Sequence, residues 1–242
     1  MKAGQRLASS RPAGVNEKFD VSAVAIDLDG TLLDTLPDIT EAADRMLAEL
    51  GRPPAGPEIV RGYIGNGIAR LTKRLLTGLP EGEPQPELFE LALDSFERHY
   101  RATFKRSSRP YPGVIPGLQR MRAARLRLAC VTNKSASFTL PLLEATGLSE
   151  YFERVVSGDS LPKKKPDPMP LLHVAGQFAL APARLLVIGD SDNDTSAARS
   201  AGCPVLCVSY GYRGARDLRE LDCDAIVGDL MEACSLIAAI GA

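Results

Sequence analysis

The sequence predicts an α/β fold, a doubly wound parallel sheet with a small all-helical unit inserted after its first strand. Three observations support this prediction. The apolar run at residues 21–26 is typical of a strand that is buried on both faces. From Tyr111 onward, short apolar runs alternate with amphipathic stretches, as in sheets whose parallel strands are joined by helices. Between these two regions, residues 36–109 show helical spacing of apolar residues and no strand pattern.

The first strand is followed by two carboxylates, Asp27 and Asp29, and then by a tight turn at Gly30. Apolar residues next recur at spacings of three and four, which predicts a helix that ends at Gly51 as its C′ residue. The stretch 51–57, GRPPAGP, is expected to be a loop because Gly and Pro disfavour regular structure. Two further helices are expected at 68–79 and 89–100.

The rest of the chain is expected to alternate between strand and helix. Ser135 is expected to cap one of the helices with its side chain. The expected strands are 128–131, 155–156, 185–188, 205–208 and 225–227, and the expected helices are 118–126, 135–147, 171–178, one that ends at Gly202, and 230–240. Three segments follow from this pattern: a flexible leader at 1–18, a core made of 19–35 and 110–242, and a helical cap at 36–109.

Composition and charge are those of an ordinary globular protein. The chain has 242 residues, of which 45% are hydrophobic and 24% charged, and its formal net charge is −1. This near-neutral balance gives no reason to expect nucleic acid or a membrane surface as a partner. No apolar run approaches the ~18 residues of a membrane span.

Five cysteines, an odd number with no CxxC pair, favour a reduced compartment, and we expect a cytoplasmic protein. Residues 1–18 contain no apolar segment of the kind that a secretory signal requires. The two histidines, His99 and His173, are far apart in sequence, which argues against a zinc site. The sequence leaves both a monomer and a homodimer open.

Polar groups follow four expected strand ends or adjacent loops. Because parallel strands bring their carboxyl ends to the same edge of a sheet, these groups are expected to share one site. They are Asp27 with Asp29, Thr132 with Asn133, Lys165, and Asp190 with Asp194. The alternative for the first pair is that both aspartates only cap a turn.

Two close carboxylates repel each other unless a cation lies between them or one holds a proton. Hard oxygen ligands of this kind suit Mg²⁺, with Asp27 and Asp190 as its holders. Lys165 would supply a second positive charge, and the Thr132 hydroxyl could hold phosphate oxygens. This combination suits phosphoryl transfer, in which positioning and charge neutralisation dominate catalysis.

The segments DLDGTLLDT, VTNK, the lysine of KKKPDP, and GDSDND resemble, in this order, the four motifs of haloacid-dehalogenase-superfamily phosphatases. The resemblance spans residues 24–194 and implies a Rossmann-like core with a helical cap between the first two motifs. It implies that Asp27 attacks phosphorus and forms an aspartyl-phosphate. It also implies that Asp29 is the acid and base, and that its backbone carbonyl binds the metal.

The same resemblance assigns roles to the remaining motif residues. Thr132 and Lys165 orient and neutralise the phosphoryl group, with Asn133 beside them as a further candidate for phosphate binding. Asp190 ligates Mg²⁺. Asp194 supports the site from the acidic loop and is a further candidate metal ligand.

Within the family, the segments RGYIGNGIARL, PYPGV and SYGYRGARD are similar to those of members that act on 2-phosphoglycolate, a small phosphorylated metabolite. Gly65, Asn66 and Gly67 are then candidates for binding a small carboxylated substrate, because glycine allows close backbone approach. The alternative is an ordinary helix start with Asn66 as N-cap. Pyrophosphate, sugar phosphates such as N-acetylmuramate 6-phosphate, and nucleotides stay open as substrates, and so does a phosphomutase.

Two hypotheses from other functional classes have less support in the sequence. A signalling receiver that is phosphorylated on aspartate also combines acidic residues, a Thr and a Lys, but it has about half this length and no helical insert. Asp29, two residues beyond Asp27, favours hydrolysis because it supplies an acid and base. A catalytically silent binding module is disfavoured because every motif carboxylate is present.

Overall fold

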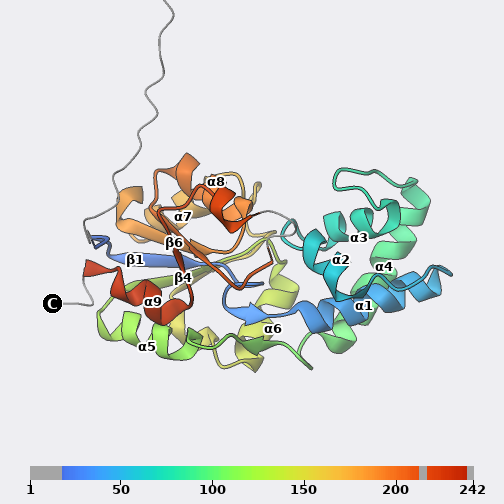
Figure 1. Cartoon of the computed structure of the whole chain (residues 1–242), viewed down its shortest axis with the longest axis horizontal. Coiled ribbons are helices and arrows are strands. Elements are labelled where there is room, and N and C mark those ends of the chain that lie inside the picture. Colours follow the sequence, from blue (N-terminus) through green and yellow to red (C-terminus); the bar gives the residue numbers. More distant parts are fainter. Residues whose placement is uncertain (1–17, 213–216, 239–242) are drawn as a thin grey trace, which may run out of the picture.

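The computed structural model describes residues 18–212 and 217–238, which form a sheet-containing core beside a block of helices (Figure 1). The predicted leader lies outside the described residues except for Lys18. Residues 213–216 of the segment SYGYRGARD and the end of the last expected helix, 239–240, also lie outside them.

Six parallel strands form the central sheet, in the order β5-β4-β1-β6-β7-β8. The central strand β1 pairs on one side with β4 and on the other with β6, so that Ile26 lies between Cys130 and Ile188. The predicted parallel sheet is therefore confirmed. Its strands are β1 (Ala23–Ile26), β4 (Arg127–Val131), β5 (Arg154–Val156), β6 (Leu185–Gly189), β7 (Val205–Val208) and β8 (Ala225–Val227).

Helices cover both faces of the sheet (Figure 1). Val24 and Ile26 join the apolar cluster on one face, whereas Ala23 and Ala25 join the cluster on the other, as the alternation of side chains along a strand requires. This burial explains why the strand sequences are almost wholly apolar. One face carries α5 (Val114–Ala123), α6 (Ala136–Ala145) and α9 (Leu230–Ser235), and the other carries α7 (Met169–Gln177) and α8 (Asp192–Ala201).

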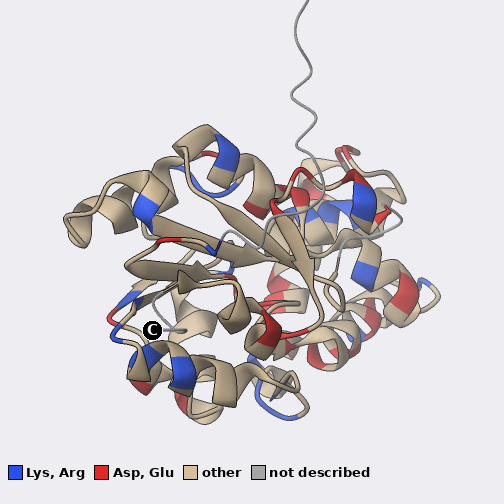
Figure 2. Cartoon of the chain, turned by 60° about the vertical axis from the view of Figure 1, so that its left-hand side comes forward, with Lys and Arg blue, Asp and Glu red and all other residues tan. Residues whose placement is uncertain are grey.

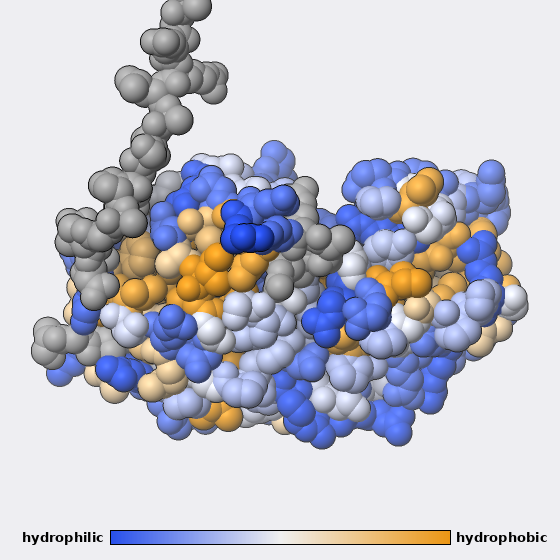
Figure 3. Space-filling model, in the orientation of Figure 1, coloured by the Kyte–Doolittle hydropathy of each residue, from blue (hydrophilic) through white to orange (hydrophobic). Residues whose placement is uncertain are grey.

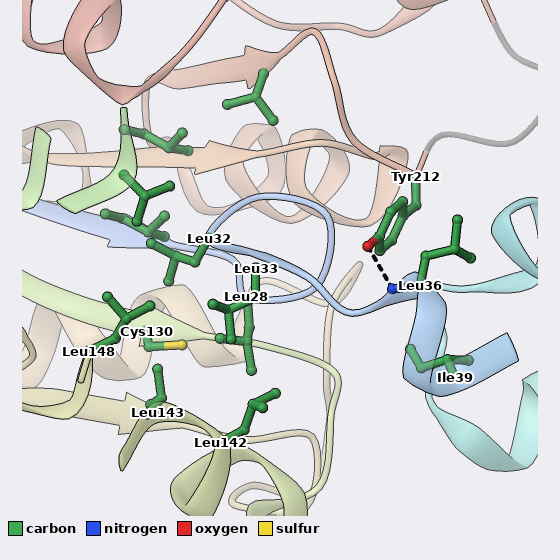
Figure 4. Packing of buried hydrophobic residues seen from close by; sticks show 14 of the residues in the cluster. Leu28, Leu32, Leu33, Leu36, Ile39, Cys130, Leu142, Leu143, Leu148 and Tyr212 are labelled. Carbon is green, nitrogen blue, oxygen red and sulfur yellow. Dashed lines mark hydrogen bonds between the residues drawn. The ribbon is translucent and has the colours of Figure 1, made fainter. Parts of the chain in front are cut away.

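Four helices follow one another between β1 and the rest of the sheet: α1 (Leu36–Glu49), α2 (Gly56–Tyr63), α3 (Ile68–Thr77) and α4 (Pro86–Thr103). α1 packs along α4. The end of α4 also reaches the core, because the ring of Phe104 meets that of Phe138 edge-on at 5.3 Å between centroids. The larger apolar cluster, part of which is drawn in Figure 4, therefore runs continuously from the sheet into these helices.

Helix α2 was not expected from the sequence. The expected loop 51–57 ends at Ala55, and Pro57 lies in the first turn of α2, where a missing N–H leaves no hydrogen bond unmade. Ser135 stands at the N-cap of α6 but forms no side-chain cap. Instead, Asp159 accepts a hydrogen bond from the N–H of Ala136 at 2.9 Å.

The surface is mixed in character. Acidic and basic residues are interspersed over the helices (Figure 2). The face seen in Figure 3 is largely hydrophilic, with hydrophobic areas over both the core and the helical block. Among residues 18–212 and 217–238, none of the helices combines the length and the apolar content that crossing a membrane requires.

Two short strands, β2 (Leu33–Asp34) and β3 (Arg109–Pro110), pair antiparallel where the chain leaves the core for the helices and returns. The sequence pattern did not indicate them, because two residues are too few to show alternation. The buried carboxylate of Asp38 reinforces the crossing by accepting hydrogen bonds from the N–H groups of Ser107 and Ser108, at 2.9 and 2.8 Å. Both chain crossings are thereby fixed side by side.

Tyr212 caps α1 from a loop that lies far away in the sequence. Its hydroxyl accepts hydrogen bonds from the N–H groups of Thr35, at 2.8 Å, and Leu36, at 2.9 Å (Figure 4). It donates to Asp34 Oδ1 at 2.5 Å. Thr35 stands at the N-cap and makes no side-chain cap of its own, so Tyr212 satisfies N–H groups that the helix leaves free.

Replacing Tyr212 by Phe is expected to lower the free energy of unfolding by about 1–3 kcal/mol, because the buried N–H of Thr35 loses its acceptor and that of Leu36 keeps only its longer bond to Asp34, at 3.3 Å. Urea unfolding measures the loss. Tyr63→Phe is the matched control, since the Tyr63 hydroxyl has no hydrogen bond to a described residue. Equal effects of the two substitutions would contradict the capping role of Tyr212.

Candidate active site

Three predicted carboxylates meet at the carboxyl edge of the sheet. One ligand oxygen from each of Asp27, Asp190 and Asp194 lies within 4.8 Å of the other two. Asp27 follows β1 and Asp190 follows β6, and these two strands are direct neighbours in the sheet. A cluster of three carboxylates of this kind could bind a metal ion.

Lys165 lies against this cluster and is only 3% exposed. Its ammonium is 2.9 Å from Asp27 Oδ1, 2.6 Å from Asp194 Oδ1 and 2.6 Å from the carbonyl oxygen of Val131. Burial acts to lower the pKa of Lys165, but the carboxylates of Asp194 and Asp27 outweigh it and hold that pKa above its ordinary value. Two of these contacts, to Asp194 and Val131, are hydrogen bonds, and the contact with Asp27 is an ion pair. A contact between Lys165 and a phosphate would therefore compete with groups that already surround the ammonium.

Asp194 is held by the turn that begins α8. Its Oδ2 accepts hydrogen bonds from the hydroxyl and the N–H of Ser191, at 2.9 and 3.2 Å, and from the N–H of Asp190 at 3.3 Å. Its Oδ1 takes the bond from Lys165 described above. Both oxygens of Asp194 thus have hydrogen-bond partners within the protein, and the carboxylate holds the Lys165 ammonium in place.

Asp190 fits into a space that only glycines leave open. A Cβ at Gly30, which has φ +85°, would lie 2.3 Å from Asp190 Oδ2, and a Cβ at Gly211 would lie 2.2 Å from the Asp190 Cβ. The N–H of Tyr212 donates to Asp190 Oδ2. The side chain is therefore held at the sheet edge by the backbone N–H of Tyr212, in the space beside Gly30 and Gly211.

The charges in this cluster do not balance. Burial raises the pKa of Asp27 to about 7, although Lys165 opposes it. Burial, reinforced by Asp194 and Asp27, also raises the pKa of Asp190 well above its ordinary value. Asp27 Oδ1 is buried and accepts no hydrogen bond of good geometry from a described residue. Three carboxylates with one ammonium leave negative charge that a divalent cation would balance.

Asp29 lies in a different environment from Asp27. Its carboxylate oxygens are 2.9 and 3.0 Å from the ammonium of Lys134, and Oδ1 also accepts a hydrogen bond from the Thr35 hydroxyl at 2.7 Å. The Asp29 carboxylate is not part of the three-carboxylate cluster. Lys134 was not predicted as a site residue, although it stands in VTNK directly after Thr132 and Asn133.

Thr132 and Asn133 lie where β4 ends, and both are buried. The Thr132 hydroxyl accepts a hydrogen bond from the N–H of Lys134 at 3.2 Å. The side-chain amide of Asn133 donates to the carbonyl oxygens of Gly65, at 2.8 Å, and Lys165, at 2.9 Å. Asn133 therefore joins the helical block to the lysine loop, and its amide donors are not free for a phosphate.

The predicted loop at Gly65, Asn66 and Gly67 lies over the site and is held there by the core. The Asn66 amide donates to Asn193 Oδ1 at 3.0 Å, and the Asn66 carbonyl accepts from Lys164 Nζ at 2.8 Å. Gly67, with φ +85°, occupies the N-cap position of α3 that Asn66 was considered for. These contacts keep the helical block closed on the sheet edge.

A cavity of about 40 Å³ lies beneath this loop. Asp27, Asp29, Asn133 and Lys134 line it from the core side. Most of its other walls are apolar and come from the helical block: Ile39, Ile64, Ile68, Leu71 and Phe96, with Tyr100 beside them. The cavity is thus polar where the aspartates lie and apolar elsewhere.

Comparison with known proteins agrees with this architecture. The pattern of the haloacid dehalogenase-like hydrolases matches residues 24–208. A phosphoglycolate phosphatase of Thiobacillus denitrificans is 55% identical over 217 residues, which are 90% of this chain and 96% of that protein. One of Nitrosospira multiformis is 56% identical over the same shares of both chains. A solved structure described as a predicted phosphoglycolate phosphatase from Haemophilus somnus has a TM-score of 0.83 at 34% identity, over 88% of this chain and 96% of that one.

Fold, site and relatives together make this protein an enzyme, a phosphatase. The chain belongs to the haloacid dehalogenase-like hydrolase family.

Replacing either partner of the buried pair Lys165–Asp194 is expected to lower the free energy of unfolding by about 3–5 kcal/mol, because the other charge stays buried and loses a partner. The double variant Lys165→Met/Asp194→Asn should lose less than the sum of the two. Urea unfolding without added divalent metal measures all three. Additive losses would contradict the coupling between these residues.

The matched control is Lys163→Met, which removes a lysine of the same loop whose side chain is 63% exposed in its pair with Asp167. Exposed ion pairs contribute at most about 1 kcal/mol, so this substitution should change stability little.

Proposed function

We propose that this phosphatase hydrolyses 2-phosphoglycolate to glycolate and phosphate, with Mg²⁺ as cofactor and an aspartyl-phosphate on Asp27 as intermediate. The observation that carries the proposal is the small cavity that Asp27 and Asp29 line together with the ammonium-bearing side chain of Lys134. The relatives named above, which are phosphoglycolate phosphatases by name, give the proposal its substrate.

Mg²⁺ would be held by Asp27 and Asp190, with Asp194 beside them and the backbone carbonyl of Asp29 as a further ligand. When bound, it would supply positive charge against the phosphate and the carboxylates. The unbalanced charge of the cluster supports this assignment, and so does Asp27 Oδ1, which has an ion pair but no hydrogen bond of good geometry to a described residue.

The proposed reaction has two steps. In the first, the Asp27 carboxylate attacks phosphorus, the bond between phosphorus and the ester oxygen breaks, and Asp29 gives its proton to the departing oxygen. In the second, water attacks the phosphorus of the aspartyl-phosphate and its proton goes to Asp29, so that phosphate leaves and Asp27 is restored. Lys165 would offset part of the negative charge of Asp27, Asp194 and the phosphoryl group, and the Thr132 hydroxyl would hold a phosphoryl oxygen.

The size of the cavity favours a small leaving group. A water molecule needs roughly 10–15 Å³ of such space. The cavity of about 40 Å³ therefore suits the CH₂–COO⁻ unit of glycolate better than a sugar or a nucleoside. Pyrophosphate, sugar phosphates and nucleotides stay alternatives for an enzyme whose helical block opens widely.

We also propose that residues 36–109 act as a cap domain on a core of residues 19–35 and 110–242. Opening for substrate would then occur near 36–37 and 109–110, beside the paired crossings β2 and β3. The hydrogen bonds from Asn66, Asn133 and Lys164 support a closed state that excludes water from the cavity.

Asp190→Asn is expected to weaken Mg²⁺ binding by at least about tenfold. Replacing even a residue that only hydrogen-bonds to a metal ligand lowers metal affinity by about that factor. Isothermal titration calorimetry of the whole chain measures the affinity. Asp192→Asn, which changes an aspartate of the same acidic loop outside the cluster, is the control. If the control loses affinity and Asp190→Asn does not, Asp190 is not a ligand of the metal.

Among phosphorylated metabolites, 2-phosphoglycolate should be hydrolysed with a kcat/KM at least about tenfold above pyrophosphate, sugar phosphates and nucleotides, because a site built around a polar group rejects substrates that lack it. Phosphate release is the measurement. Asp27→Asn should abolish turnover, and retained turnover would rule out the aspartyl-phosphate mechanism. A higher kcat/KM on another ester would replace the proposed substrate.

A further inference from the structure

We infer that Lys134 and Tyr100 form the site that binds the carboxylate of the substrate and so selects a phosphate ester with an anionic leaving group. This inference rests on the proposed function and assigns the residues that would select 2-phosphoglycolate among phosphate esters. Lys134 stands in VTNK two positions after Thr132, and Tyr100 lies outside all four motifs.

Lys134 is the one cation among the described residues that line the cavity. Its side chain is only 3% exposed. Two of its contacts go to the oxygens of Asp29, at 2.9 and 3.0 Å, and its ammonium also lies 5.0 Å from the centre of the Tyr100 ring. The ammonium therefore lies between the acid of the proposed reaction and Tyr100.

The hydroxyl of Tyr100 is the second observation. Tyr100 is fully buried, and the Lys134 ammonium lies beside its hydroxyl oxygen. Among residues 18–212 and 217–238, the hydroxyl has no hydrogen bond of good geometry and its proton has no acceptor. A buried hydroxyl without a partner is costly, so such a group calls for an acceptor. Burial raises the pKa of Tyr100 to about 12, and the group therefore keeps its proton and acts as a donor.

The remaining walls explain why these two groups would decide specificity. Ile64, Ile68, Leu71 and Phe96 offer no hydrogen bond to an anion. A carboxylate buried among them without a cation would be strongly disfavoured. With the phosphate at Asp27 and the ester oxygen near Asp29, the carboxylate of glycolate lies two bonds beyond that oxygen, on the side of Lys134.

The positions of the two groups are consistent with this placement. Both Lys134 and Tyr100 line the cavity, and the ammonium of Lys134 supplies a positive charge for the carboxylate of the substrate. Tyr100 would donate to the same carboxylate, and two donors of this kind are the usual way to hold a buried carboxylate.

The test uses two unreactive phosphonates that differ only in the carboxylate, 3-phosphonopropionate and propylphosphonate. Calorimetry in Mg²⁺ measures the affinity of the whole chain for each. The wild type should bind 3-phosphonopropionate more tightly. Tyr100→Phe should reduce the ratio of the two affinities by about tenfold, and Lys134→Met should reduce it further, because hydrogen bonds to charged groups are of that strength.

Since neither phosphonate reacts, a change in the acid role of Asp29 does not disturb the ratio. Lys163→Met, which removes an exposed lysine outside the cavity, should leave the ratio unchanged. Tyr100→Phe removes one oxygen only, so the test holds even where Lys134→Met does not fold.

The outcomes separate the two proposals. If the wild type prefers 3-phosphonopropionate and both variants keep that preference, or lose affinity for both ligands equally, the inference is overturned while the proposed substrate stands. If the wild type does not prefer 3-phosphonopropionate, the proposed substrate itself is wrong.

Discussion

One buried ammonium, that of Lys165, holds together the side chains at the carboxyl edge of the sheet. It joins three parts of the chain that are far apart in sequence: Asp27 after β1, the carbonyl of Val131 at the end of β4, and Asp194 in α8. Without it, carboxylates that lie within 4.8 Å of one another would repel. The order of the strands brings these groups to one edge, but the lysine makes their burial there tolerable.

A second lysine, Lys134, gives the two aspartates of the first motif different surroundings. Asp27 and Asp29 are two residues apart, yet Asp27 pairs with Lys165 in the carboxylate cluster and Asp29 pairs with Lys134 beside the cavity. Neighbouring carboxylates whose surroundings differ in this way can take different tasks, as in the proposed mechanism, where one is the nucleophile and the other the acid and base. The proposed roles would then follow from the lysine that each aspartate contacts.

Much of the fold and part of the site could be predicted from the sequence, because strand burial and strand ends are local features. The apolar strands and the placement of Asp27, Asp190 and Lys165 at one sheet edge follow from periodicity and topology. Lys134 could not be assigned, since its partner Asp29 lies 105 positions away. Tyr212 caps a helix 177 positions from itself. Helix α2 was missed because its start is rich in Gly and Pro, which suggested a loop.

The pairing of β2 with β3 has a consequence for how such a protein can diversify. Leu33 faces Pro110 and Asp34 faces Arg109, so the chain departs from the sheet and comes back at neighbouring points. The four helices between β2 and β3 therefore form the connection of a very short hairpin. The entropic cost of closing such a connection grows only with the logarithm of its length, by about 0.6 kcal/mol for each doubling. Natural variation can therefore lengthen, shorten or exchange those helices, and with them the walls of the cavity, while the sheet and its carboxylates keep their positions.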